Sequence, residues 1–366
     1  MILHLYFARK FALTLLAILA VIGMVILMID MVDELNRFDI GTISAAEALH
    51  LSALRVPAEL YNVLPLIVVL ATVTLFLGLA RTSELVITRA AGRSALRALV
   101  APVGTALLFG GVAVAVFNPI VAATTKQYQN ASSAYQKGTT SVLSVSAEGL
   151  WLRQGGPDGQ IIVHAVRANP EGTQFFEVTF QAFAPEGRPI WRIEAASATL
   201  VKGGWEILGA KRWAFGPDSP NPEAAALQQD RLTLASDLTS DRIRESFASP
   251  AAIAIWDLPA FIAGLERAGF SARTHRIWFQ MELAMPGILA AMVLLGAGFT
   301  MRHTRFGRTG LMVMLALGLG LALFFLRNFA QVLGENGQIP VALAAWSPPA
   351  AGILLSLGLL LHLEDG

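Results

Sequence analysis

Six stretches of this 366-residue chain contain no Asp, Glu, Lys or Arg and are long enough to cross a lipid bilayer, which takes about 20 residues. They are Phe11–Ile29, Leu60–Ala80, Ala98–Thr125, Leu283–Met301, Thr309–Leu326 and Asn336–Leu361. Each is expected to be helical, because an open sheet would leave backbone groups unpaired in lipid. We expect the fifth helix to continue to about Phe329, and so to include Arg327, and the sixth to begin near Val341.

The segment between the third and fourth stretches, from Lys126 to Glu282, differs in composition. It holds 31 of the 53 charged residues in 157 positions, whereas the other 209 positions hold 22. A soluble domain is therefore predicted between two groups of three helices. The predicted boundaries are 1–125 for the first helices, 126–256 for the inserted domain, and 257–366 for an interfacial helix and the last three spans.

The inserted domain is predicted to be all-β, because its apolar residues alternate as in half-buried strands. The predicted strands are Leu150–Leu152, Ile161–Val163, Phe175–Phe183, Pro189–Ile193 and Trp205–Leu208, with glycine-rich turns at 155–159 and 203–204. Strands at this spacing are typical of a sandwich or jelly roll. Asp257–Ala268 is predicted to be a helix at the outer membrane surface. Two roles remain open for the domain: a passive cap, and a binding domain that receives a ligand from the membrane part.

Basic residues gather in the loops on one side of a six-helix arrangement. They are Arg9, Lys10, Arg81, Arg89, Arg93, Arg97, Arg302, Arg305 and Arg308. The opposite loop, Asp30 to Glu59, holds six acidic residues and two arginines. Because basic loops stay in the cytoplasm, both termini are predicted to be cytoplasmic and the β domain to lie outside the cytoplasm.

The sequence lacks the residues that several kinds of catalytic and metal-binding site require. Cysteine is absent, which excludes disulfides and thiolate ligands. No phosphate-binding G-x-x-x-x-G-K-[ST] loop and no H-E-x-x-H motif occurs, and the six histidines show no metal-ligand spacing. The net charge of +1 gives no indication of a nucleic-acid partner. No catalytic site, metal or cofactor is therefore expected on this chain.

The loop at 83–97 (SELVITRAAGRSALR) is predicted to form a short helix under the membrane, with Ser83 as a candidate N-cap. Glu84 suits its first turn, where a negative charge complements the helix dipole. The residues expected to share one face are Leu85, Thr88 and Arg89. Charge bias across the membrane explains the arginines but not an acidic residue. We therefore expect Glu84 to meet a partner with a basic groove.

Four segments resemble the permease family of the lipopolysaccharide export transporter, the LptF/LptG type. They are Leu64-Pro65, Ser83-Glu84-Leu85-Val86, Arg89–Ser94 and Leu333–Pro349. The Ser-Glu-Leu-Val form, the residues 29–33 that end the first span, and the Gly-x-Ile-Pro segment resemble the LptG branch more than the LptF branch. The arrangement of three helices, a β domain and three helices is also similar.

This resemblance implies a transport subunit rather than an enzyme, in the inner membrane of a Gram-negative bacterium. It implies a heterodimer with a homologous LptF-like permease on a dimeric cytoplasmic ATPase, which binds ATP and Mg. Lipopolysaccharide would pass from the outer leaflet of that membrane to a periplasmic jelly-roll bridge. Glu84 would couple the ATPase to the permease, with Leu85, Arg89 and Arg93 beside it.

The lipid phosphates need cations near the outer surface, and the candidates are Arg37, Arg55 and Arg327. The predicted lipid path on the β domain includes Phe176, Val178 and Phe180. The chain departs from the family at two places. Asp30 lies in the stretch where the family often has several basic residues, and Glu282 lies where a lysine is often found.

Two other functions remain open on the sequence alone. One is another ABC-type permease or mechanotransmitting subunit with an extracytoplasmic domain. The other is a membrane-anchored assembly protein that transports nothing.

Overall fold

The computed structural model describes residues 2–37, 44–90, 94–135, 143–146, 149–156, 159–169, 173–215, 221–236, 249–267, 271–301 and 309–364. The chain divides into two units. The membrane unit holds residues 1–135, 251–256 and 273–366, and the β unit holds residues 136–250 and 257–272.

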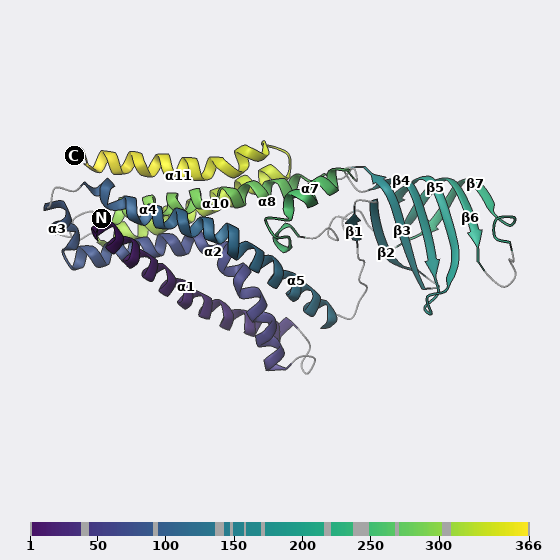
Figure 1. The fold of residues 1–366 in the computed structure, drawn as a ribbon, viewed down its shortest axis with the longest axis horizontal. Helices are drawn as coiled ribbons and strands as arrows, with labels where there is room; N and C mark the ends of the chain where they lie inside the picture. The colour runs from purple at the N-terminus through teal and green to yellow at the C-terminus, as the bar shows by residue number, and fades with distance from the viewer. Residues whose placement is uncertain are drawn as a thin grey trace. The chain divides into compact units, whose positions relative to one another are not determined.

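Helices make up the membrane unit (Figure 1). Before the β unit they are α1 (Ile2–Arg37), α2 (Ala45–Arg81), α3 (Glu84–Ala90), α4 (Ala95–Val112), the π-helix η1 (Ala113–Phe117) and α5 (Asn118–Tyr135). After it they are α8 (Arg273–Leu283), α9 (Met285–Thr300), α10 (Thr309–Glu335) and α11 (Val341–Glu364). Within the described residues, five helical spans are long and apolar enough to cross a membrane, and α8 with α9, bent by 49°, makes a sixth when the pair is counted as one span. The six predicted spans are therefore present, with the fourth broken.

The helix ends follow local sequence signals. Ser44 caps α2 in a capping box with Glu47, and the Ser94 side chain caps α4. The sixth span begins at Val341, as predicted, directly after Pro340. The fifth continues beyond Phe329, to Glu335.

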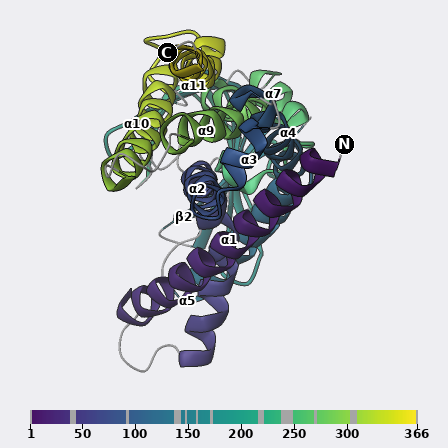
Figure 2. The same cartoon turned by 90° about the vertical axis from the view of Figure 1, so that its left-hand side faces the viewer.

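Helix α9 is the most enclosed of the membrane-unit helices. It contacts α2, α4, α10 and α11, which lie around it in Figure 2. It packs tightly on α4, because a Cβ atom at Gly110 would lie 2.6 Å from the Cα atom of Pro286. Only glycine allows that approach. By contrast, α1 and α10 leave most of their apolar side chains exposed.

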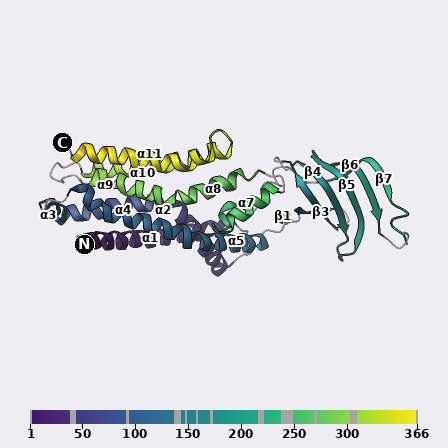
Figure 3. The same cartoon turned by 45° about the horizontal axis from the view of Figure 1, so that its top comes forward.

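The β unit contains one seven-stranded antiparallel sheet (Figure 3). Its strands are β1 (Leu143–Ser146), β2 (Gly149–Gly156), β3 (Gly159–Ala168), β4 (Gln174–Phe183), β5 (Pro189–Val201), β6 (Gly204–Ala214) and β7 (Leu227–Ala235). The five predicted strands correspond to β2 through β6, while β1 and β7 were not predicted. The unit also contains the helix α7 (Leu258–Arg267), whose bounds nearly match those of the predicted interfacial helix. A 3₁₀ turn, η2 (Pro250–Ala252), precedes α7 in the chain.

The sheet curls around its own apolar face. In a flat sheet β2 and β6 would lie about 19 Å apart, at roughly 4.8 Å per strand. Yet Gln154 on β2 accepts hydrogen bonds from the indole of Trp205 on β6 (3.3 Å) and from Ser236 (2.9 Å). Phe175 and Phe180 also pack on the Trp205 ring. Among the described strands each pairs with its sequence neighbour, so the topology is a curled meander without Greek-key crossovers. The β unit has an apolar interior, as its half-buried strands predicted. A single curled sheet encloses this interior.

Candidate functional site

Glu84 is the first residue of α3, where the chain turns out of the long helix α2. The last turn of α2 is closed by the backbone N–H of Thr82, which donates to the carbonyl of Gly78 at 3.0 Å. Ser83 then adopts a left-handed backbone conformation with φ of 59°, which is costly for a residue with a side chain. An N-cap needs extended backbone. Ser83 is therefore the turn residue between two helices and lacks the geometry of the predicted cap.

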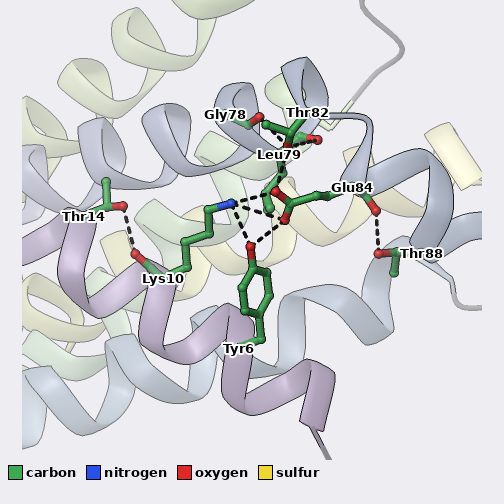
Figure 4. Close-up of polar contacts among 8 residues, drawn as sticks. All are labelled: Tyr6, Lys10, Thr14, Gly78, Leu79, Thr82, Glu84 and Thr88. Carbon is green, nitrogen blue, oxygen red and sulfur yellow. Dashed lines mark hydrogen bonds and ion pairs between the residues drawn. The ribbon is translucent and has the colours of Figure 1, made fainter.

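The carboxylate of Glu84 is held against α1 by a clamp of three side chains (Figure 4). Lys10 donates to Oε1 at 2.9 Å and to Oε2 at 3.2 Å. The hydroxyl of Tyr6 donates to Oε2 at 2.9 Å, and the hydroxyl of Thr82 donates to Oε1 at 2.8 Å. Tyr6 and Lys10 lie one helical turn apart and are themselves hydrogen-bonded at 3.1 Å. The clamp fixes the start of α3 to the first helix of the chain.

The clamp keeps Glu84 ionised. Partial burial raises the pKa of Glu84, but the hydrogen bonds from Lys10, Thr82 and Tyr6 and the charge of Lys10 outweigh it. The net pKa therefore lies below the ordinary value of a glutamate. The side chains of Lys10 and Glu84 are 33% and 28% exposed, so a partner protein can reach the pair. A pair so close to solvent contributes little stability alone, up to about 1 kcal/mol.

One face of α3 anchors it to the bundle and another is free. Leu85 and Thr88 are buried, as their predicted shared face requires, and Thr88 donates to the carbonyl of Glu84 at 2.7 Å. Ile87, by contrast, is 67% exposed. The side chain of Arg89 and the whole of Arg93 lie outside the described residues. The structure therefore brings Glu84, Leu85 and Ile87 together on α3 and leaves the two arginines as predictions.

Two of the three predicted phosphate ligands, Arg37 and Arg55, surround the buried carboxylate of Glu34. Arg55 lies 3.4 Å from a Glu34 oxygen and 3.9 Å from an oxygen of Asp30. Arg37 donates to the hydroxyl of Tyr128 at 2.7 Å, and that hydroxyl donates to Glu34 at 2.6 Å. Both arginines thus already have counter-charges on this chain. Asp30, a departure from the family pattern, is one of them.

The third predicted phosphate ligand, Arg327, lies on α10, eight residues before the end of that helix. It is half-buried and interacts electrostatically with Glu282 and Tyr61. Glu282 is 1% exposed and accepts a hydrogen bond from the Tyr61 hydroxyl. Arg327 is far in sequence from Arg37 and Arg55 and has a separate set of partners.

The predicted lipid-path residues do not share one face of the sheet. Val178 and Phe180 are buried in its curled interior, with Phe180 against Trp205. Phe176 is half-buried, with the guanidinium of Arg167 6.0 Å from its ring. The cause is Glu177, whose φ of 55° interrupts the two-residue alternation. A lipid chain could reach Phe180 only if the sheet opens.

Sequence reasoning missed the residues that hold the site together. In the sequence Lys10 serves only as one of the basic residues that indicate the cytoplasmic side, and no pattern singles out Tyr6. Glu34 was counted only as loop charge, although it is fully buried. A sequence signal did exist. Acidic residues follow the apolar stretch of the first span without interrupting its helical periodicity. An acidic residue on a packed helix face needs a partner on the neighbouring helix.

Two comparisons bear on the chain. A family model described as "Lipopolysaccharide export system permease LptF/LptG" matches residues 5–362. The chain is 23% identical over 334 residues to the "Lipopolysaccharide export system permease protein LptG" of Haemophilus influenzae, and the match covers 89% of this chain and 88% of that protein.

Proposed function

Because the chain belongs to the LptF/LptG family of lipopolysaccharide export permeases, we propose that it is a permease subunit driven by a separate ATPase. It takes lipopolysaccharide from the outer leaflet of the inner membrane and passes it to a periplasmic jelly-roll bridge. The protein is a multi-pass inner-membrane protein of the transport class. The family match over nearly the whole chain is the observation that carries the proposal.

The proposed ATPase docks on α3, with Glu84 as the coupling residue. The support is the geometry of this segment. It is a short helix between two spans, with an ionised carboxylate at its first residue and an exposed Ile87 beside it. The clamp by Tyr6 and Lys10 links any movement of α3 to α1.

The exposed apolar faces of α1 and α10 support a lateral route for the lipid. Among the continuous spans of the described residues, these two are the least buried. In the proposal they face a second, LptF-like permease and the acyl chains that pass between the two subunits. Helix α10 also carries the half-buried Arg327, on the face that packs toward the other helices of the unit.

The proposed orientation puts both termini and α3 in the cytoplasm and the β unit in the periplasm. Basic residues at Arg9, Lys10, Arg81 and Arg97 support it. The ends of α1 and α2 that carry Asp30, Glu34, Arg37, Arg55 and Glu59 would then face the periplasm.

The test is purification of the tagged full-length chain from its native membrane under mild detergent. We expect an ATPase and a second six-span permease to co-purify, and ATP hydrolysis to drive lipopolysaccharide release to a periplasmic acceptor. An ATPase that moves a different substrate would support another ABC-type permease. Recovery without any ATPase would overturn the proposal in favour of an assembly protein.

A further inference from the structure

A group of four polar residues lies among the apolar helices of the membrane unit. They are Tyr61, Asn118, Glu282 and Arg327, from α2, α5, α8 and α10, and are called the Tyr61 cluster below. The first three are 6%, 3% and 1% exposed. Ionisable side chains at such positions in membrane proteins are costly and mark functional sites by default.

A hydrogen bond restrains Glu282 in the cluster. The Tyr61 hydroxyl donates to Glu282 Oε2. Asn118 lies near both Tyr61 and Glu282, and its Oδ1 accepts a hydrogen bond from the backbone N–H of Ile255 at 2.8 Å. The bond from Tyr61 therefore limits how far the Glu282 carboxylate can follow Arg327.

The packing of α10 places Arg327 on the same inward side. Gly320, Arg327 and Gly334 are seven residues apart and so share one face of the helix. At Gly320 that face meets Val69 of α2, because a Cβ atom on this glycine would lie 3.1 Å from the Val69 side chain. At Gly334 a Cβ atom would lie 2.7 Å from Ala344 of α11 and 3.0 Å from the side chain of Ile277 of α8. Arg327 therefore lies on the side of α10 that packs on α2, α8 and α11, which is consistent with its electrostatic interaction with Tyr61 and Glu282.

The cluster lies where two irregular helices meet. Asn118 directly follows the π-helix η1, and Glu282 precedes the 49° break between α8 and α9. Near these irregularities α4 and α9 touch, at Gly110 and Pro286. Bulges of this kind occur frequently at functional sites, and neither helix is free to slide past the other at this contact.

Glu282 and an incoming phosphate would therefore compete for the guanidinium of Arg327. An arginine without a counter-charge is expensive in a membrane, and Glu282 supplies the counter-charge when no ligand is present. A phosphate carries more charge than a carboxylate and offers bidentate acceptors to a guanidinium. The hydrogen bond from Tyr61 restrains Glu282, so an incoming phosphate can compete with its carboxylate for Arg327.

We propose that Glu282 is a positioning residue that sets the affinity of Arg327 for the phosphate of a lipid headgroup. It keeps the guanidinium neutralised while the site is empty and weakens phosphate binding enough for the lipid to leave. The inference rests on the proposed function, because it takes the ligand to be a phosphorylated lipid.

The experiment measures equilibrium binding of lipopolysaccharide, and of the same lipid with its lipid A phosphates removed, to the co-purified complex in nanodiscs. We expect Glu282→Gln to bind the phosphorylated lipid roughly fivefold tighter or more, the scale of one coupling between sites, and to release it more slowly. Binding of the dephosphorylated lipid stays unchanged. Glu335→Gln, on the same helix as Arg327 and outside the cluster, should match the unaltered protein.

If Glu282 had a purely structural role, its replacement would not increase the affinity for the phosphorylated lipid. Equal or weaker binding of the phosphorylated lipid by a normally inserted Glu282→Gln variant would overturn the inference. If that variant does not accumulate, Tyr61→Phe replaces it. Loss of the hydroxyl lets Glu282 turn toward Arg327, so we expect weaker phosphate-dependent binding, and unchanged binding would overturn the inference.

The same data separate this inference from the proposed function. If the unaltered protein binds both lipids equally and Arg327→Gln changes nothing, the proposed phosphate contact itself is wrong. If the unaltered protein prefers the phosphorylated lipid and Glu282→Gln behaves identically, only the role of Glu282 is wrong.

Discussion

The ammonium of Lys10 lies 2.9 Å from the carboxylate of Glu84, which joins the first helix of the chain to a helix that begins 74 residues later. Tyr6 reinforces the contact from the same helix. A force applied at α3 therefore reaches α1 directly. Most α1 side chains are exposed, while Phe7, Phe11 and Leu15 pack into the core of the unit. This contact gives the proposed ATPase a mechanical path to α1.

Reversal of the charge at Glu84 is expected to abolish lipid export while the protein remains inserted. Glu84→Lys places two cations together and removes the acceptor for three donors. Export is measured by lipopolysaccharide arrival at the cell surface, and membrane insertion by the amount of protein in the membrane fraction. Glu186→Lys, at an exposed turn of the β unit, is the matched control and should export normally.

The double variant Lys10→Glu with Glu84→Lys distinguishes the clamp from docking. If Glu84 acts only through Lys10, the swap restores export. If Glu84 also meets a basic groove on the ATPase, the swap leaves export defective even though the clamp is rebuilt. We expect the second result, with ATPase co-purification reduced. Full export by Glu84→Lys alone would refute the assignment of Glu84 as the coupling residue.

Acid sensitivity is expected to depend on Lys10. The clamp lowers the pKa of Glu84, so its stabilisation is present above the ordinary glutamate pKa of about 4.3 and is lost as pH falls through the lower folded value. Lys10→Met removes the strongest donor and leaves partial burial, which raises the pKa. ATPase activity coupled to lipid release should therefore fail at a higher pH in Lys10→Met. Identical acid profiles for the two proteins would argue against this ion pair in the working complex.

The exposed Ile87 is expected to contribute to ATPase docking. Ile87→Asp should reduce ATPase co-purification by about fivefold or more, the effect of losing a contact worth over 1 kcal/mol at an interface. The thermal midpoint should change little, because the side chain is already 67% exposed. Ile87→Leu keeps the apolar surface and is the control. Normal recovery of the ATPase with Ile87→Asp would place the docking surface elsewhere.

A photocrosslinker at Phe180 is expected to capture lipopolysaccharide only while ATP is hydrolysed. Phe180 is fully buried inside the curled sheet, so the interior must open before lipid enters. The same probe at Phe176, which the left-handed backbone of Glu177 turns away from that interior, should give fewer adducts. Absence of adducts at several interior positions would favour the passive-cap role.

Much of the fold followed from the order of residues alone. Charge-free stretches of about 20 residues have few alternatives to a membrane helix, and the start of α11 at Val341 matched its prediction. Strands β2 to β6 followed from alternation and glycine turns. The break at Ala284 and the π-helix at Ala113 were not predicted; Pro286, at the start of α9, is a local signal for the break.

The sequence by itself determined which segments enter the membrane, that a β domain separates them, and that Glu84 is the exceptional acidic residue in a basic loop. These are local properties of composition and spacing. Only the tertiary structure decided what each charge meets. It paired Glu84 with Lys10, surrounded Glu34 with Arg37 and Arg55, and placed Glu282 near Arg327. In a medium that solvates charges poorly, such partners come from helices far apart in sequence, and no local pattern specifies them.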